Sequence, residues 1–144
     1  MIEAKKVLVP VNGSSSDDTV ISLAAQTAKR NRGHVYAIHV IEVGFAYPVD
    51  AELVEERRRA DTILDNAERI AERWGQEIET EILQARDIGT AIIEEAIDSH
   101  ADLIVLGVPY RTRTGEFDLG KTALHVLQHA SCEVWLCRGP MPPA

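Results

Sequence analysis

Long apolar runs and cysteines are both scarce in this sequence of 144 residues. No apolar stretch approaches the ~20 residues that a membrane-spanning helix needs. The short apolar run near the N-terminus is interrupted by Pro10 and Asn12, which argues against a signal peptide. The two cysteines, Cys132 and Cys137, are too few for a disulfide framework, and we expect both to be reduced and buried. These features predict a cytoplasmic protein without a membrane segment.

Basic residues are also in the minority, with 15 lysines and arginines against 23 aspartates and glutamates. The net charge of −8 disfavours nonspecific binding to nucleic acids or to anionic membranes, because their phosphates would be repelled. We therefore expect neither as a partner. A phosphate ligand would require a local cluster of basic or N–H groups.

The chain does contain the alternation of strands and helices that is typical of an α/β domain. Every connection between two β-type runs holds a helical pattern, as parallel strands require. Residues 102–107 are almost wholly apolar and are expected inside the sheet, whereas residues 77–83 alternate and are expected at an edge. The sequence predicts one three-layer α/β/α domain over residues 1–139, with a doubly wound, five-stranded parallel sheet, and a flexible tail over residues 140–144. The expected strands are residues 6–12, 34–43, 77–83, 102–107 and 133–138, and the expected helices are residues 14–33, 50–75, 87–101 and 121–130.

The first two helices have recognisable ends. Asp17 and Asp18 lie in the first turn of the first helix, where negative charge suits the helix dipole. Gly33 and Gly75 are expected just beyond the first and second helices, because glycine favours the left-handed conformation that commonly ends a helix.

Ligands of doubly wound sheets bind beyond the C-terminal ends of the strands, which here directs attention to residues 10–16, 40–50 and 107–122. The third loop contains GEFDLGKT (115–122), which satisfies the phosphate-loop pattern G-x-x-x-x-G-K-[ST]. Two features argue against a nucleotide hydrolase of that class. Seven residues separate the strand end near Gly107 from the first glycine of the pattern, and two of its four variable positions are carboxylates, which repel phosphate.

What remains of that pattern is Gly120, Lys121 and Thr122 at the start of a helix. Such a position offers backbone N–H groups and the positive end of the helix dipole. Arg111 and Arg113 come earlier in the same loop. The group indicates an anion site, or else ordinary helix capping beside solvated arginines, and both interpretations stay open.

Three blocks of the sequence resemble the universal stress protein family. They are KVLVPVNGSSSDDTVISLAAQTA (6–28), ADLIVLG (101–107) and HASCEVWLCR (129–138), the last of which is similar to the family's HAPCPVLVVR. The resemblance implies a sheet of strand order 3-2-1-4-5. It also implies, commonly, a homodimer joined through the fifth strand, Glu133 to Arg138.

Some members of that family bind ATP through a motif G-x2-G-x9-G-[ST] after the fourth strand. The spacing is kept here, and Gly107 and Gly120 match. Tyr110 replaces the second glycine, and Lys121 replaces the serine or threonine, although Thr122 follows directly. Glycine allows close approach to phosphate that a tyrosine would obstruct, whereas a lysine adds a charge for phosphate.

A further departure lies after the first strand, where Asn12 replaces the expected aspartate and would bind a ribose hydroxyl more weakly. The resemblance implies that the end of the first strand meets adenine and ribose, the second strand lines the adenine pocket, and the last loop holds the phosphates. These three groups are Pro10, Val11 and Asn12, then Val40 and Ile41, then Gly107, Gly120, Lys121 and Thr122.

Two hypotheses about function stay open. The first is a regulatory module that binds ATP or AMP, with Mg²⁺ or Mn²⁺ only alongside ATP, at most weak ATP hydrolysis and no catalytic residue. The second is a dimeric stress-response protein that binds no ligand and acts through a protein partner. Tyr110 and Asn12 favour the second hypothesis, whereas Lys121 and the retained spacing favour the first.

Four other features lead to expectations. The apolar residues 43–49 are either a lid over the site or a surface loop packed on the next helix. His39 is expected as a hydrogen-bonded imidazole in the core or at the edge of the pocket. His125 and His129 share a helix face without an apparent third ligand, so no metal site is expected. The charge run over residues 55–61 is expected to be a solvated helix face.

Overall fold

We describe the protein from a computed structural model, which describes residues 4–108, 112–113, 116–117 and 119–139. The predicted tail over residues 140–144 lies outside this range, as do Tyr110 and Arg111. No helix in the described part of the chain is long and apolar enough to cross a membrane.

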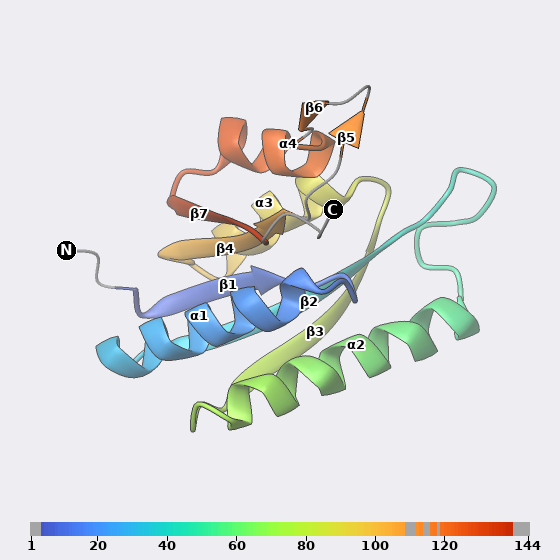
Figure 1. Ribbon diagram of the computed structural model, residues 1–144. Coiled ribbons are helices and arrows are strands. Elements are labelled where there is room, and N and C mark those ends of the chain that lie inside the picture. Colours follow the sequence, from blue (N-terminus) through green and yellow to red (C-terminus); the bar gives the residue numbers. More distant parts are fainter. Residues whose placement is uncertain (1–3, 109–111, 114–115, 118, 140–144) are drawn as a thin grey trace.

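The centre of the fold is a five-stranded sheet in which all neighbouring strands run parallel (Figure 1). The strand order is β3-β2-β1-β4-β7, which confirms the predicted order 3-2-1-4-5, since β7 is the fifth strand of this sheet. The inner strand β4 is buried and the edge strand β3 is half-exposed, as their apolar patterns predict. The strands are β1 (Lys6–Pro10), β2 (His34–Glu42), β3 (Ile78–Ala85), β4 (Leu103–Val108) and β7 (Glu133–Arg138).

In the described part of the chain, four helices cover the two faces of the sheet, which confirms the three-layer α/β/α fold (Figure 1). One apolar cluster lies under α1 and α2 and includes Val7 and Val9 of β1. The other lies under α3 and α4 and includes Leu8 of the same strand. Successive residues of a strand point to opposite faces, so β1 contributes to both cores. The helices are α1 (Ser16–Asn31), α2 (Val54–Glu72), α3 (Ile88–Asp98) and α4 (Lys121–His129).

Two short strands interrupt the connection between β4 and α4. β5 (Thr112–Arg113) and β6 (Glu116–Phe117) pair in antiparallel fashion and form a separate two-stranded sheet. The sequence patterns did not predict this pair, because two-residue strands have no measurable periodicity.

The prediction for the end of α1 was wrong in one respect. Arg32, with φ 57°, takes the left-handed conformation at this end, and Gly33 does not. A glycine is needed at position 33 for another reason, since a Cβ there would lie 2.6 Å from the backbone oxygen of Lys5. At the end of α2, Gly75 has the expected positive φ of 69°.

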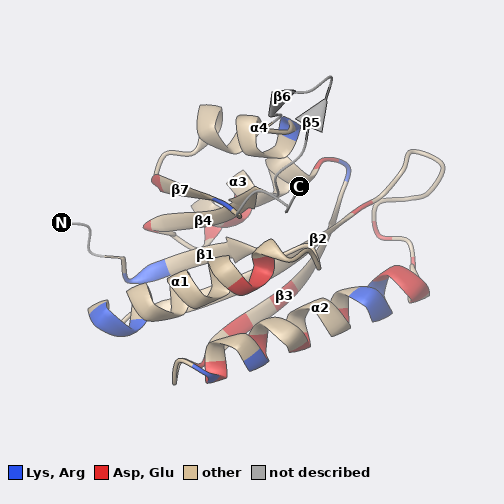
Figure 2. Ribbon diagram, in the orientation of Figure 1, with Lys and Arg blue, Asp and Glu red and all other residues tan. Residues whose placement is uncertain are grey.

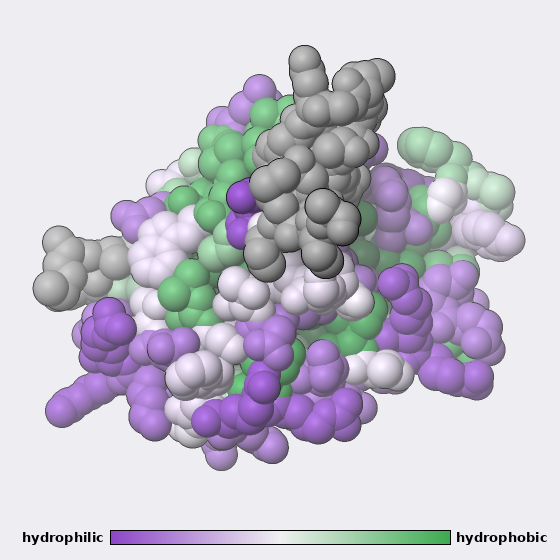
Figure 3. All heavy atoms as spheres, in the orientation of Figure 1, coloured by the Kyte–Doolittle hydropathy of each residue, from purple (hydrophilic) through white to green (hydrophobic). Residues whose placement is uncertain are grey.

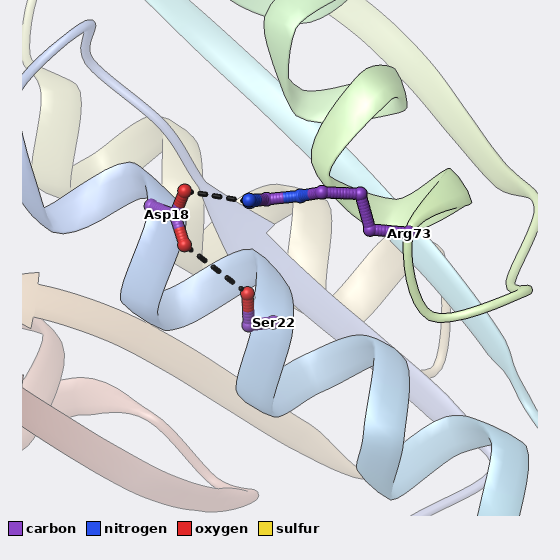
Figure 4. A network of polar contacts seen from close by, with 3 residues as sticks. All are labelled: Asp18, Ser22 and Arg73. Atoms are coloured by element: carbon purple, nitrogen blue, oxygen red, sulfur yellow. Dashed lines mark hydrogen bonds and ion pairs between the residues drawn. The ribbon is translucent and has the colours of Figure 1, made fainter.

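An ion pair on the outer surface joins α1 to the end of α2. Arg73 Nη2 lies 2.6 Å from Asp18 Oδ2, and Ser22 Oγ donates a hydrogen bond to Asp18 Oδ1 (Figure 4). Both charged side chains are more than half exposed, so the ion pair is worth about 0–1 kcal/mol. Acidic residues lie at the start of α1 and basic residues at its end, as the helix dipole favours (Figure 2).

The two cysteines are free and only half-buried, whereas the sequence predicted buried side chains. Cys132 packs against the α3–α4 core and Cys137 against the α1–α2 core. Partial burial raises the pKa of both thiols, so neither is activated as a nucleophile.

Candidate functional site

A cavity of about 520 Å³ opens at the C-terminal ends of β1, β2 and β4. Its volume lies within the range of roughly 300–1,000 Å³ that is usual for small-molecule sites. Residues from both helical layers line it, among them Asp17 of α1 and Ile92 of α3. The structure brings together in this cavity all nine residues that the sequence singled out: Pro10, Val11, Asn12, Val40, Ile41, Gly107, Gly120, Lys121 and Thr122.

The turn between β1 and α1 is organised by a buried carboxylate. Asp17 is 4% exposed and accepts hydrogen bonds from the backbone N–H of Asn12 (3.2 Å) and of Gly13 (2.8 Å). Burial raises the pKa of the Asp17 carboxyl, and the two N–H groups oppose that effect. Asn12 Oδ1 in turn accepts from the backbone N–H of Ser14 at 3.0 Å. The acceptors of this turn therefore hold its own backbone in place.

Sequence reasoning placed Asp17 in the first turn of a helix and missed this role. A signal was available, because Asp17, Ile21, Ala24 and Ala28 follow one another at helical spacing. That spacing places Asp17 on the stripe of α1 that faces the sheet, where a carboxylate requires hydrogen-bond donors.

His39 lines the cavity from β2, and its expected role as a hydrogen-bonded imidazole at the pocket edge is confirmed. The side chain is 8% exposed, and Nδ1 lies 2.8 Å from the carbonyl oxygen of Val11. This contact joins β2 to the segment that follows β1.

Gly107 lies near the end of β4 and faces α1. A Cβ at this position would lie 2.7 Å from Ser16 Oγ and 2.9 Å from Ser16 Cβ. Close packing against Ser16 is therefore sufficient reason for a glycine here, with or without a phosphate ligand.

The opposite side of the cavity is formed by the start of α4. Gly120, with φ 86°, immediately precedes the helix, and Lys121 and Thr122 form its first turn. The first turn directs backbone N–H groups and the positive end of the helix dipole toward this end of the cavity. Lys121 is exposed and close enough to Asp87 to help lower the pKa of that carboxyl, after the stronger effect of the Thr90 N–H and hydroxyl groups.

The charged residues over 55–61 are exposed, which confirms the expected solvated helix face, and two of them also reach the mouth of the cavity. Glu56 and Arg59 line the cavity, and Arg59 Nη2 lies 3.5 Å from the backbone oxygen of Asn12. Helical spacing places these two residues on one face, but the sequence does not show that this face meets the β1–α1 turn, 47 residues earlier.

The loop over residues 43–49 does not cover the cavity, because none of its residues lines it. Phe45 is 90% exposed, and the loop projects from the sheet at the right of Figures 1 and 3. Two side chains at the end of β3 fix the loop. Arg86 donates to the carbonyl oxygens of Val43 and Gly44, and its guanidinium lies 5.1 Å from the Phe45 ring centroid, while Gln84 donates to the carbonyl oxygen of Val49. The structure thus corrects the lid interpretation and shows a surface loop held by β3 and its following turn.

The two histidines of α4 lie side by side, with 4.4 Å between the ring centroids of His125 and His129. In the part of the chain that the structure describes, no group of three or more potential ligands is placed to hold a metal ion. The side chains of Arg113 and of its neighbours over residues 109–118 are not described, so the predicted basic patch of that loop lies outside this description.

Comparison with known proteins agrees with these structural features. The sequence profile of the universal stress protein family matches residues 3–138, and the chain belongs to this family. A universal stress protein of Methanocaldococcus jannaschii is 32% identical over 142 residues, which cover 94% of this chain and 83% of the relative.

Two solved structures from Archaeoglobus fulgidus share the fold. A universal stress protein superposes with a TM-score of 0.78 at 26% identity, and the match covers 91% of this chain and 96% of the other. A universal stress protein in complex with dAMP superposes with a TM-score of 0.76 at 24% identity, covering 94% and 98% of the two chains.

Proposed function

We propose that this universal stress protein is a regulatory module that binds an adenine nucleotide, AMP or ATP, in the cavity at the ends of β1, β2 and β4. The observation that supports this best is the uneven polarity of the cavity. Its α4 end presents a helix N-terminus, Lys121 and Thr122, all suited to an anion. Its opposite wall presents His39 and the buried carboxylate of Asp17, which would repel an anion.

A nucleotide matches this distribution because its phosphate is anionic and its sugar and base carry hydrogen-bond donors. Apolar side chains between the two ends, including Val40 and Ile41, suit the face of a base. The related fold in complex with dAMP is consistent with a ligand of this size. A divalent cation would enter only with the triphosphate, and no catalytic residue is assigned, so hydrolysis is at most weak.

The first test is whether the purified protein binds AMP or ATP. Nucleotide released by denaturation is sought by mass spectrometry, and dissociation constants are measured by titration calorimetry. Absence of co-purified nucleotide together with no thermal shift at millimolar AMP and ATP would sink the proposal.

Lys121 provides the matched test of the phosphate end. Lys121→Ala should weaken AMP binding by about threefold to tenfold, since an exposed charge-assisted contact is worth about 1 kcal/mol. Lys121→Arg keeps the charge and should bind nearly as well as wild type. Equal affinity of all three proteins would show that Lys121 does not contact phosphate.

We also propose that the protein forms a homodimer that pairs through β7. A dimer is the feature on which the second hypothesis, a stress-response protein without a ligand, depends. Among the described strands, β7 pairs only with β4 and is the last strand in the order of the sheet, and edge strands are common sites of pairing between subunits. Leu124 and Leu127 of the adjacent helix α4 are 47% and 45% exposed. Light scattering should report twice the chain mass of 15.9 kDa, and a monomer at micromolar concentration would contradict this assembly.

A further inference from the structure

The ring of His39 has a defined hydrogen-bonding orientation. Nδ1 lies 2.8 Å from the carbonyl oxygen of Val11, and a carbonyl oxygen only accepts. Nδ1 therefore carries a hydrogen atom and donates it. In the neutral imidazole the other nitrogen, Nε2, then has a free lone pair and is an acceptor.

This Nε2 atom is open to the cavity. Within the part of the chain that the structure describes, Nε2 has no hydrogen-bond partner. In that part of the chain, every fully buried side-chain nitrogen or oxygen has a hydrogen-bond partner. Because Nε2 has none, it must keep some accessible surface, although His39 as a whole is 92% buried. Since the ring lines the cavity, that surface faces the space a ligand would fill.

The neighbouring acceptors are already engaged. Both carboxylate oxygens of Asp17 accept backbone N–H groups, and Asn12 Oδ1 accepts the N–H of Ser14. His39 Nε2 differs from these oxygens, because among the described residues no donor uses its lone pair and a ligand can do so.

We propose that His39 is a specificity-determining residue whose Nε2 accepts a hydrogen bond from a sugar hydroxyl of the bound nucleotide. This inference rests on the proposed function. A lone pair beside the Asp17 carboxylate repels a phosphate group and attracts an O–H donor. Ile38 and Val40 of β2 face the α3–α4 core, so His39 between them faces the side of the sheet that α1 and α2 cover. Lys121 belongs to α4 on the other side, so the phosphate and the sugar would contact different walls of the cavity.

Two substitutions separate the structural contact from the ligand contact. In His39→Asn, the side-chain amide can take the place of Nδ1–H and donate to Val11, but no acceptor remains at the position of Nε2. In His39→Gln, an amide can reach the position of Nε2, and Val11 loses its donor. Urea unfolding of both variants shows whether the fold is retained.

The experiment compares the affinities of AMP, 2′-deoxy-AMP and 3′-deoxy-AMP. Wild type should bind AMP about threefold to tenfold more tightly than one of the two deoxy analogues. His39→Asn should bind AMP correspondingly more weakly and show no preference over that analogue. A wild type without hydroxyl preference, or an Asn variant that keeps the wild-type preference, would overturn the assignment of His39.

A direct measurement covers the case in which the variants do not fold. The ¹⁵N resonance of His39 Nε2 in wild type should move on addition of AMP and move less with the discriminated deoxy analogue. An unchanged resonance at saturating AMP also overturns the inference. If wild type binds none of the three nucleotides, the proposed function itself fails, whereas binding without hydroxyl preference refutes the role of His39 alone.

Discussion

Substituting alanine for Gly107 tests whether the end of β4 packs as closely on α1 as the structure shows. The new Cβ would lie 2.7 Å from Ser16 Oγ, 2.9 Å from Ser16 Cβ and 3.2 Å from Val20 Cγ1, against 3.4–4 Å for ordinary contacts. Overpacking of this kind costs about 1–3 kcal/mol. The lower backbone entropy of alanine in the unfolded chain offsets about 0.5–1 kcal/mol of that cost. We expect Gly107→Ala to lower the free energy of unfolding by about 1–2 kcal/mol.

The assay is urea unfolding followed by circular dichroism, with the m-value compared to confirm that only stability changes. Gly44→Ala is the matched control, because a Cβ there meets nothing within 4 Å, and its stability should stay within about 0.5 kcal/mol of wild type. A Gly107→Ala protein as stable as this control would refute the reasoning.

A second substitution shows whether Ser16 is the cause of the strain. Ser16→Gly removes both of the nearest atoms, at a cost of its own because Ser16 Oγ also bonds Ser14 Oγ at 2.7 Å. The double variant with Gly107→Ala should be more stable than the sum of the single effects predicts, by about 1 kcal/mol. Strict additivity would mean that the two positions do not contact each other.

Two further predictions concern carboxylates beside the cavity. Asp17→Asn should destabilise the protein by about 1–3 kcal/mol in urea unfolding, because its amide would point an N–H group at a backbone donor such as that of Gly13. Asp18→Asn is the control, since Asp18 is an exposed neighbour, and it should cost at most about 1 kcal/mol. Asp87 accepts the N–H of Thr90 at 2.9 Å and caps α3, so Asp87→Ala should cost about 1 kcal/mol at pH 7. Because these bonds lower the pKa of Asp87, its contribution to the free energy of unfolding is full at neutral pH and is lost as the pH falls through that lowered pKa. The free energies of unfolding of wild type and Asp87→Ala should therefore converge in acid. A difference that stays constant with pH would contradict the assignment.

The positions of two strands in the sheet could be predicted from their apolar patterns, whereas the full strand order was implied by the resemblance to the family. Residues 103–106 of β4 are apolar without alternation and are buried on both faces, whereas β3 alternates and lies at an edge. The three loops that meet at the cavity were also predictable, since the ends of parallel strands in a doubly wound sheet meet at one edge, and the resemblance to the family selected the nine residues within them.

The remaining parts of the site depend on contacts that a linear pattern does not encode. Arg59 meets Asn12 only because α2 packs beside α1. The open nitrogen of His39 follows from its contact with Val11, 28 residues away. Gly33 was assigned the left-handed conformation by its residue type, but the chain needs a glycine there for the approach of Lys5 and uses Arg32 for the turn.

The position of the cavity between the two helical layers has a consequence for dynamics. Its walls come from α1 and α2 on one face of the sheet and from α3 and α4 on the other, and the two layers have separate apolar cores. A bound molecule would therefore contact both cores at once and tie their local unfolding together. Amide hydrogen exchange should then slow in both layers on binding, rather than only in the loops at the mouth. In this way, occupancy of a single cavity can be sensed at helix surfaces on opposite sides of the molecule.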